Sequence, residues 1–283
     1  MTDLPAPETF LSGEPRSVGG RRARVRARVA DALLSARAAV ARTDAQLEAL
    51  ATAAPQREVL VMSIYRPPAA RLVEALPALR SNGHDVQFRF GSTAEPVDAL
   101  AEHTVATGLG AGKFENLNAL WPGEPPAWTI VIDDDVGLSP RFLDRFIGVL
   151  ERFELAMAQP AQTHSSHAAW SVTRRRGGAL LRETRFVEIG PVTALRRDAA
   201  AELIPFPPLR YGWGLDAHWA AVAEQHGWRL GVVDALPVRH DEGVVAGTYS
   251  GDEAIEEARR FLAERPYVPS ARLRETLAVH RRA

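Results

Sequence analysis

From residue 57 onward, short apolar runs alternate with helical patterns, and this alternation limits the folds that the chain can adopt. The runs 58–64, 84–90, 128–133 and 154–159 have the length and composition of β-strands, and helical patterns separate them. This order predicts an α/β domain with a mixed, mostly parallel sheet and helices on both faces. Ligands of such sheets bind at the carboxyl ends of the strands, so function is expected there.

Four helical patterns lie between or after these strands: 68–83, which stops at a glycine, 95–105, 113–121 and 139–153. The last is expected to begin with Ser139 as its N-cap and Pro140 in the first helical position. The second half is less regular. Residues 182–204 suggest a strand, a turn and a helix, and residues 210–240 suggest a glycine-rich turn, a helix and a strand.

The chain ahead of this domain has a different composition. Residues 1–19 carry Pro, Gly and Ser and predict a disordered tail, and residues 20–55 predict a helical extension. The main domain is expected over residues 56–251 and a C-terminal helical segment over 252–283.

The extension has an apolar stripe at helical spacing and arginines clustered at its start; the stripe consists of Val25, Val29, Leu33, Ala36 and Val40. One interpretation is a basic arm for an anionic partner. The other is a helix that packs on the main domain, or on a second copy in a homodimer, with its arginine face in solvent. The stripe needs a partner, which favours the second interpretation.

Composition excludes several classes of function. The formal net charge of -1 gives no general attraction to nucleic acid or to a membrane, and without cysteine any metal must be held by oxygen or nitrogen. No apolar run is long enough to span a bilayer and no signal peptide is evident, so a cytoplasmic protein is expected.

Two nucleotide-binding motifs are absent from the sequence. "TGLGAGKF" (107–114) lacks the Ser or Thr of a P-loop, which argues against a P-loop NTPase, and no G-x-G-x-x-G follows the first strand, which argues against a dinucleotide oxidoreductase.

Three consecutive aspartates, Asp133, Asp134 and Asp135, follow the apolar run "WTIVI". Three like charges at the end of a buried strand repel one another unless a cation compensates them. Carboxylates suit a hard divalent ion such as Mg²⁺ or Mn²⁺, whose remaining positions take phosphate oxygens and water. The other interpretation is an acidic turn that caps the helix after it.

Several segments resemble GT-A type glycosyltransferases. "VLVMSIYRPPAARLVEAL" resembles their first strand and helix, "GKFENLNAL" the helix before the metal-binding strand in family 2, and "TIVIDDDVGLSPRFLDRFI" that strand with its D-x-D motif. "GWGLD" looks like the Gly-Trp-Gly-x-acid segment of inverting galactosyltransferases. The order "DDD", "AQP", "RFVEIGPV", "GWGLD", "GVVD", "VRH" over residues 57–249 is similar to an unassigned plant and bacterial glycosyltransferase-like family.

The resemblance implies a GT-A-like fold and a metal-dependent, inverting glycosyltransferase. Such an enzyme moves a sugar from a nucleotide-sugar donor to an acceptor hydroxyl, here of unknown identity, with Mn²⁺ or Mg²⁺ as cofactor. The alternative is a non-catalytic GT-A-like protein that binds a nucleotide sugar or a glycan.

The resemblance also implies roles for individual residues. Asp135 is the main metal ligand, Asp133 a second ligand or ribose contact, and His240 the histidine that completes the metal site. Asp216 is the general base, and Trp213 offers a ring to the sugar. His240 could equally be a surface histidine at a strand end, and Asp216 the N-cap of the helix that follows it.

Other residues are expected near the nucleotide or the acceptor. Tyr65, Arg66, Lys113 and Asn116 are expected at the nucleotide, although the last three could equally be surface or capping residues. Glu188 either lines the acceptor cleft or pairs with an arginine such as Arg185. The stretch around His164 and His167 predicts a mobile loop over the acceptor cleft, and "TRRRGG" (173–178) either grips an anionic acceptor or is a solvated loop.

Overall fold

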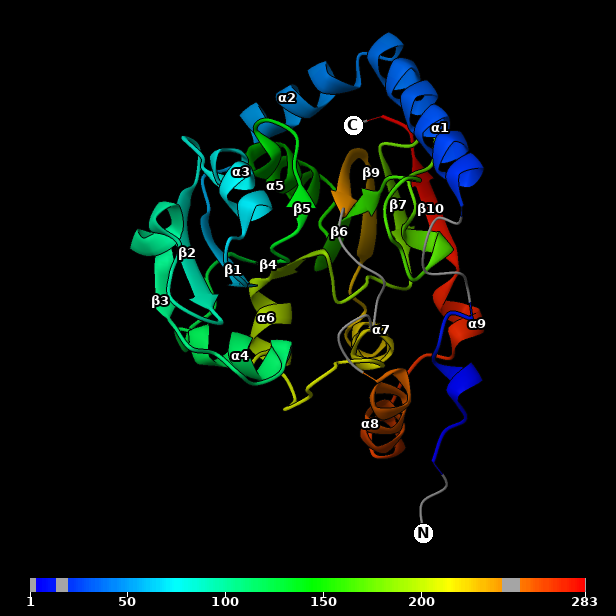
Figure 1. Cartoon of the computed structure of the whole chain (residues 1–283). Helices are drawn as coiled ribbons and strands as arrows, with labels where there is room; N and C mark the ends of the chain where they lie inside the picture. Colours follow the sequence, from blue (N-terminus) through cyan, green and yellow to red (C-terminus); the bar gives the residue numbers. More distant parts are fainter. Residues whose placement is uncertain (1–3, 14–19, 241–249, 283) are drawn as a thin grey trace.

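The computed structural model describes residues 4–13, 20–240 and 250–282 (Figure 1). Within them lies a sheet of ten strands, in the order β10-β7-β9-β6-β8-β4-β1-β2-β3, with β5 paired to β9 beside this path. The strands are β1 Glu58–Tyr65, β2 Asp85–Ser92, β3 Thr104–Ala106, β4 Trp128–Ile132, β5 Val136–Gly137, β6 Met157–Gln162, β7 Leu181–Thr184, β8 Val192–Arg196, β9 Leu230–His240 and β10 Thr276–His280.

The sheet contains two groups of parallel strands, one on each side of β8. Strand β1 pairs in parallel with both β2 and β4, and β6 pairs in parallel with β9. Strand β8 lies between β4 and β6 and is antiparallel to both. The predicted α/β class with a mixed sheet is therefore confirmed.

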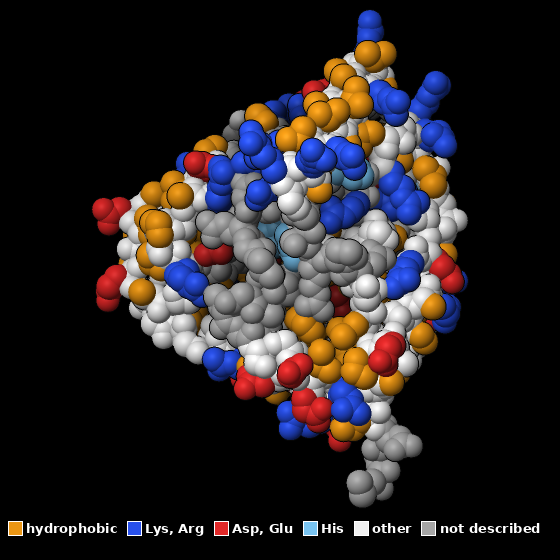
Figure 2. Space-filling view, turned by 45° about the vertical axis from the view of Figure 1, so that its right-hand side comes forward, with side chains coloured by type: hydrophobic (Ala, Val, Ile, Leu, Met, Phe, Trp, Pro, Cys, Tyr) orange, Lys and Arg blue, Asp and Glu red, His pale blue; other side chains and the backbone are white. Residues whose placement is uncertain are grey.

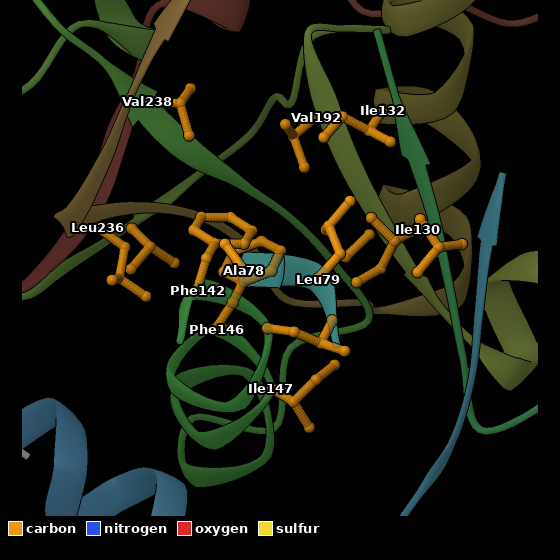
Figure 3. Packing of buried hydrophobic residues seen from close by; sticks show 14 of the residues in the cluster. Ala78, Leu79, Ile130, Ile132, Phe142, Phe146, Ile147, Val192, Leu236 and Val238 are labelled. Atoms are coloured by element: carbon orange, nitrogen blue, oxygen red, sulfur yellow. The ribbon is translucent and has the colours of Figure 1, made fainter. Parts of the chain in front are cut away.

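Helices cover both faces of this sheet (Figure 1). Alternate residues of a strand face opposite sides: Val59 and Val61 of β1 join the apolar cluster that includes α3 and α5, whereas Leu60 and Met62 join the cluster with α4, α6 and α7. Figure 3 shows part of the first cluster, where side chains of α5 and β4 meet. The helices are α1 Arg21–Val40, α2 Thr43–Ala53, α3 Ala70–Leu79, α4 Lys113–Leu120, α5 Phe142–Arg152, α6 Arg197–Leu203, α7 Leu215–His226, α8 Gly251–Ala263 and α9 Ser270–Leu273.

Three elements differ from the prediction. Helix α5 begins at Phe142, after Arg141 in the left-handed conformation (φ 55°), so Ser139 does not cap it. Residues 95–105 hold a 3₁₀ helix, Asp98–His103, and the start of edge strand β3. The C-terminal segment adds strand β10, antiparallel to β7, to its helices. Exposed and half-buried residues alternate along this strand, "TLAVH", as they do in a strand at the edge of a sheet.

The N-terminal region is more closely attached than predicted. In the described part of the expected tail, residues 4–13, Phe10 is only 2% exposed and packs among residues of the second cluster. The extension is two helices rather than one, because Arg42 (φ 52°) interrupts it. Helix α2 packs on α5, where a Cβ at Gly148 would lie 2.7 Å from the backbone of Leu50.

Helix α1 packs through a different side from the one predicted. The stripe that begins at Val25 faces solvent, and the half-buried residues are Ala27, Ala30, Asp31, Leu34 and Ala38. No helix within the described residues is both long and apolar enough to cross a membrane.

Candidate functional site

Two carboxylates and an imidazole gather where β4 and β9 end. One ligand atom from each of Asp133, Asp135 and His240 lies within 4.8 Å of the other two. His240 Nε2 lies 3.0 Å from Asp135 Oδ1. Among the described residues this is the one group of three or more His and acidic side chains at such spacing.

The backbone brings these residues together across a long stretch of sequence. Strand β4 is buried along its whole length and ends at Ile132, directly before the triplet. The short strand β5 then pairs antiparallel with the end of β9, with Val136 opposite His240. Asp134 is directed elsewhere, because its Oδ2 accepts the Arg66 N–H at 2.8 Å. Burial raises the pKa of Asp134 despite that hydrogen bond.

Lys113 and Gly190 lie beside Asp133. Lys113 Nζ lies 2.5 Å from Asp133 Oδ1 and donates to the Ile189 carbonyl at 3.1 Å. A Cβ at Gly190 would lie 2.8 Å from Asp133 Oδ2 and 3.1 Å from Lys113 Nζ, so a larger residue there would displace the ends of these two side chains. Burial would lower the pKa of His240, but the Asp135 carboxylate raises it overall.

This donor set fits a divalent cation. Two carboxylates and one imidazole provide oxygen and nitrogen ligands, a combination that Mn²⁺ accepts more readily than Mg²⁺.

Asp133 and His240 line a cleft of about 240 Å³. Its apolar surfaces come from aromatic side chains and from the N-terminal segment. The lining includes Phe10, Leu11, Ser12, Lys113, Asp133, Gln162, His167, Trp170, Glu188, Gly190, Tyr211, Trp213, Asp216 and His240.

Asp216 lies in the first turn of α7, inside the same cleft. The residue that precedes the helix is Gly214, so Asp216 is not the N-cap. Its Oδ1 accepts the N–H of Ala217 at 2.9 Å, and burial raises the pKa of its carboxyl to about 7. A carboxyl with that pKa changes its ionisation near neutral pH, as a general base requires.

Glu188 is a second buried carboxyl in the cleft. The sequence left two alternatives for it, a place in the acceptor cleft or a pair with an arginine such as Arg185. It accepts hydrogen bonds from the Thr173 hydroxyl (2.8 Å), the Gln162 amide (2.8 Å) and the Trp170 N–H (3.0 Å). Burial nevertheless raises its pKa to about 7, and the charge of Asp216 adds to the shift. The proposed partner Arg185 pairs instead with Glu224 and Glu275.

Three residues expected at the nucleotide make hydrogen bonds to protein groups. Tyr65 is 0% exposed, and its hydroxyl bonds Thr104 at 2.9 Å and accepts the Val97 N–H. Asn116 is buried and donates to the Ala111 carbonyl. Arg66 contributes its backbone N–H to Asp134, while its side chain is exposed. The first two are therefore structural residues, because polar groups at the end of β1 and the start of α4 satisfy local backbone and side-chain partners.

The glycines of "GWGLD" serve protein packing. Gly212 and Gly214 have φ of +76° and +82°. A Cβ at Gly212 would lie 2.2 Å from the Phe114 ring, and one at Gly214 would lie 2.9 Å from Leu262. Protein side chains therefore occupy the space beside both glycines. Between them, Trp213 lines the cleft.

The segment 163–178 is held by its own arginines. Arg174 donates to the carbonyls of Thr163, His164 and Ser166, and Arg175 donates to Ser35. These arginines bind protein groups rather than an acceptor. His167 of this segment lines the cleft, whereas His164 bonds the Arg175 carbonyl. Phe10 and Gln162 are cleft residues that sequence reasoning missed, and neither sits in a recognisable motif.

Comparison with known proteins tests the fold. The chain matches no protein-family model and no curated protein. It is similar to the structure of S. aureus TarS 1-349 in complex with UDP-GlcNAc, with TM-score 0.52 and 10% identity over 73% of this chain and 65% of that one. It is also similar to GalNAc-T7 with UDP, GalNAc and Mn²⁺, with TM-score 0.51 and 12% identity over 69% of this chain and 45% of that one.

A third similar structure is the mannosyltransferase PcManGT from Pyrobaculum calidifontis in complex with GDP-Man and Mn²⁺. Its TM-score is 0.49, with 15% identity over 77% of this chain and 70% of that chain. Sequence identities this low support a shared fold and not a shared activity. The described domain has the GT-A glycosyltransferase fold.

Proposed function

We propose that this protein is a metal-dependent, inverting glycosyltransferase that moves a sugar from a nucleotide-sugar donor to an acceptor hydroxyl. One observation carries the proposal: ligand atoms of Asp133, Asp135 and His240 gather within 4.8 Å of one another, and Asp133 and His240 line the cleft that also holds the buried carboxyl of Asp216. The GT-A fold and the nucleotide-sugar complexes of its structural neighbours support the same conclusion.

The donor would bind with its diphosphate at the acidic group. A divalent cation held by Asp133, Asp135 and His240 would act as a Lewis acid on the departing diphosphate. Lys113, already within 2.5 Å of Asp133, provides a second positive charge beside that position. Trp213 offers an aromatic face to the sugar ring.

Asp216 would then remove the proton of the acceptor hydroxyl as the oxygen attacks the anomeric carbon. A bond forms between the acceptor oxygen and that carbon, the bond from the carbon to the diphosphate oxygen breaks, and the nucleoside diphosphate leaves with the bonding electrons. The proton moves to an Asp216 carboxylate oxygen. A single displacement of this kind inverts the anomeric centre.

The first test of this function is a thermal-shift panel. UDP, GDP, CDP and ADP are added separately, each with Mn²⁺ and each with EDTA. A ligand that binds only the folded state raises the apparent melting temperature, so we expect one diphosphate to stabilise the protein only with Mn²⁺. Stabilisation by none of the four would contradict the donor assignment.

Turnover separates an enzyme from a binding protein. The nucleotide sugars of the stabilising base are incubated with the protein, Mn²⁺ and a panel of hydroxyl acceptors, and the released diphosphate is measured. Release that depends on an acceptor supports transfer. Metal-dependent binding without release under any of these conditions would favour a non-catalytic nucleotide-sugar-binding protein.

Activity and stability are expected to change in opposite directions with pH. Burial raises the pKa of Asp216 to about 7, and only its carboxylate accepts a proton, so kcat/KM at saturating Mn²⁺ should fall about tenfold per pH unit below that value. A carboxyl with a raised folded-state pKa stabilises the fold below its unfolded pKa, and this contribution is lost as pH rises through about 7.

The free energy of unfolding should therefore decrease from pH 5 to pH 8, on the order of a few kcal/mol for such a shift. Rate profiles and chemical denaturation at several pH values measure the two trends. Because Asn does not titrate, Asp216→Asn should reduce the pH dependence of stability. An equal dependence in the variant and the wild type would contradict the assignment.

A further inference from the structure

Helix α1 is oriented by polar contacts on one of its sides. The Asp31 carboxylate accepts the N–H groups of His164 (2.7 Å) and Ser165 (2.9 Å). The Ser35 hydroxyl accepts from Arg175 Nη1 at 3.0 Å. Leu34, on the same side, reaches a position 2.7 Å from where a Cβ of Gly177 would lie. These contacts determine which face of α1 is turned toward solvent.

The solvent face carries an uncovered apolar stripe. Val25 and Val29 are each 53% exposed, Leu33 is 58% exposed and Val40 is 87% exposed. At 100° per residue these four positions fall within one sector of the helix, roughly opposite Asp31 and Leu34. Four large apolar side chains in one line on a solvent face are more than scattered surface hydrophobics.

Arginines lie along both edges of this stripe. On the helical wheel Arg21 and Arg28 fall on one edge, and Arg26 and Arg37 on the other, while Arg22 falls in the sector of the stripe itself, at its N-terminal end. Helix α1 contains six arginines and a single acid, Asp31, for a net charge of +5, and that acid faces inward. Figure 2 shows hydrophobic side chains interspersed with cationic ones at the top of the molecule.

Charge argues against a second copy as the occupant of this face. Pairing two α1 helices would bring +5 against +5. The neighbouring acids on α2, Asp44 and Glu48, already contact Arg145, and Glu48 also contacts Arg141. Nucleic acid would satisfy the arginines but would leave the valine and leucine stripe in water. An anionic lipid surface satisfies both, because apolar side chains enter the acyl boundary while arginines reach the head groups.

We propose that α1 is an interfacial helix that docks this protein on anionic membrane surfaces. The helix lies in the plane of the interface, with Val25, Val29, Leu33 and Val40 directed into it. Because α1 is hydrogen-bonded to segment 163–178, which also contributes His167 and Trp170 to the cleft, docking holds the cleft at a defined distance from the lipid.

The test is flotation of the full chain with lipid vesicles. Wild type should bind vesicles of phosphatidylcholine in which phosphatidylglycerol is about a third of the lipid, bind pure phosphatidylcholine weakly, and detach at high salt. Val29→Ser with Leu33→Ser should weaken partitioning about tenfold or more. Arg26→Gln with Arg28→Gln should weaken it by about the same factor on the anionic vesicles.

Strand β10 provides a matched control. Leu277 and Val279 are 54% and 47% exposed, so Leu277→Ser with Val279→Ser removes similar exposed apolar area outside the α1 stripe and should bind as wild type. Thermal melts check that every variant is folded. Absence of binding to anionic vesicles, or equal binding by wild type and the Val29/Leu33 variant, overturns the proposal. So does a dimer, seen by light scattering, that the same variant dissociates.

Discussion

Replacing Asp216 with asparagine is expected to lower kcat about a thousandfold while leaving the affinity for Mn²⁺ and the nucleoside diphosphate nearly unchanged. The amide retains the shape of the carboxyl but accepts no proton from the acceptor hydroxyl. It also relieves the buried acid of its ionisation cost, since burial raises the pKa of Asp216 to about 7. The variant should therefore be folded and at least as stable as wild type at pH 8.

Asp252 provides the matched control for this experiment. It occupies the second position of α8, as Asp216 does in α7, but is exposed and does not line the cleft. Asp252→Asn should leave the kinetics unchanged. Steady-state rates and diphosphate binding measured on both variants give the comparison. Full transfer by Asp216→Asn would exclude the base assignment, and loss of diphosphate binding would assign Asp216 to donor recognition instead.

The second large effect is expected from Asp135→Asn. This substitution removes one of two carboxylates from the proposed cation site and takes the charged partner from His240, which lies 3.0 Å away. We expect Mn²⁺ affinity to fall about a hundredfold or more, because hard divalent ions depend on charged oxygen ligands. Stabilisation by the diphosphate, and with it turnover, should be lost at Mn²⁺ concentrations that saturate wild type.

The neighbouring residue in the triplet is the control. Asp134 accepts the Arg66 N–H and lies outside the group of three ligands. Asp134→Asn should leave thermal stability nearly unchanged, because its amide oxygen can still accept the Arg66 N–H, and should keep the metal-dependent shift. Calorimetric titration of Mn²⁺ into each variant distinguishes the two residues. Equal affinity in Asp135→Asn and wild type would rule out this metal site, and a larger loss in Asp134→Asn would transfer the ligand role to the middle aspartate.

The parts of the fold that follow from apolar periodicity could be predicted from the sequence. "EVLVMSI" and "WTIVI" become central strands because β-branched and large apolar residues suit a sheet covered on both faces. The ordered motifs also predicted one site for Asp133, Asp135 and His240, and the structure brings these three together because strand ends on one edge of such a sheet converge.

The misplaced residues depend on tertiary contacts that local patterns do not contain. Tyr65 has the position expected of a nucleotide contact, yet its hydroxyl finds Thr104 in the interior. Ser139 and Pro140 form a good capping sequence, but α5 begins at Phe142. The stripe of α1 has helical spacing, and spacing alone does not say which side of a helix meets the protein. Hydrogen bonds from segment 163–178, far along the chain, determine which side of α1 meets the protein.

The position of β8 has a consequence for the order of folding during synthesis. Residues 128–132 form a fully buried strand, but one of its edges pairs with residues 192–196, which the ribosome makes about sixty residues later. Until then the growing chain exposes an apolar, unpaired edge that is prone to aggregate. The proposed cation site combines Asp133 and Asp135, directly after β4, with His240 at the end of β9. Cation-dependent stabilisation should therefore arise only after β9 has docked. Metal binding would thus report completed folding as well as function.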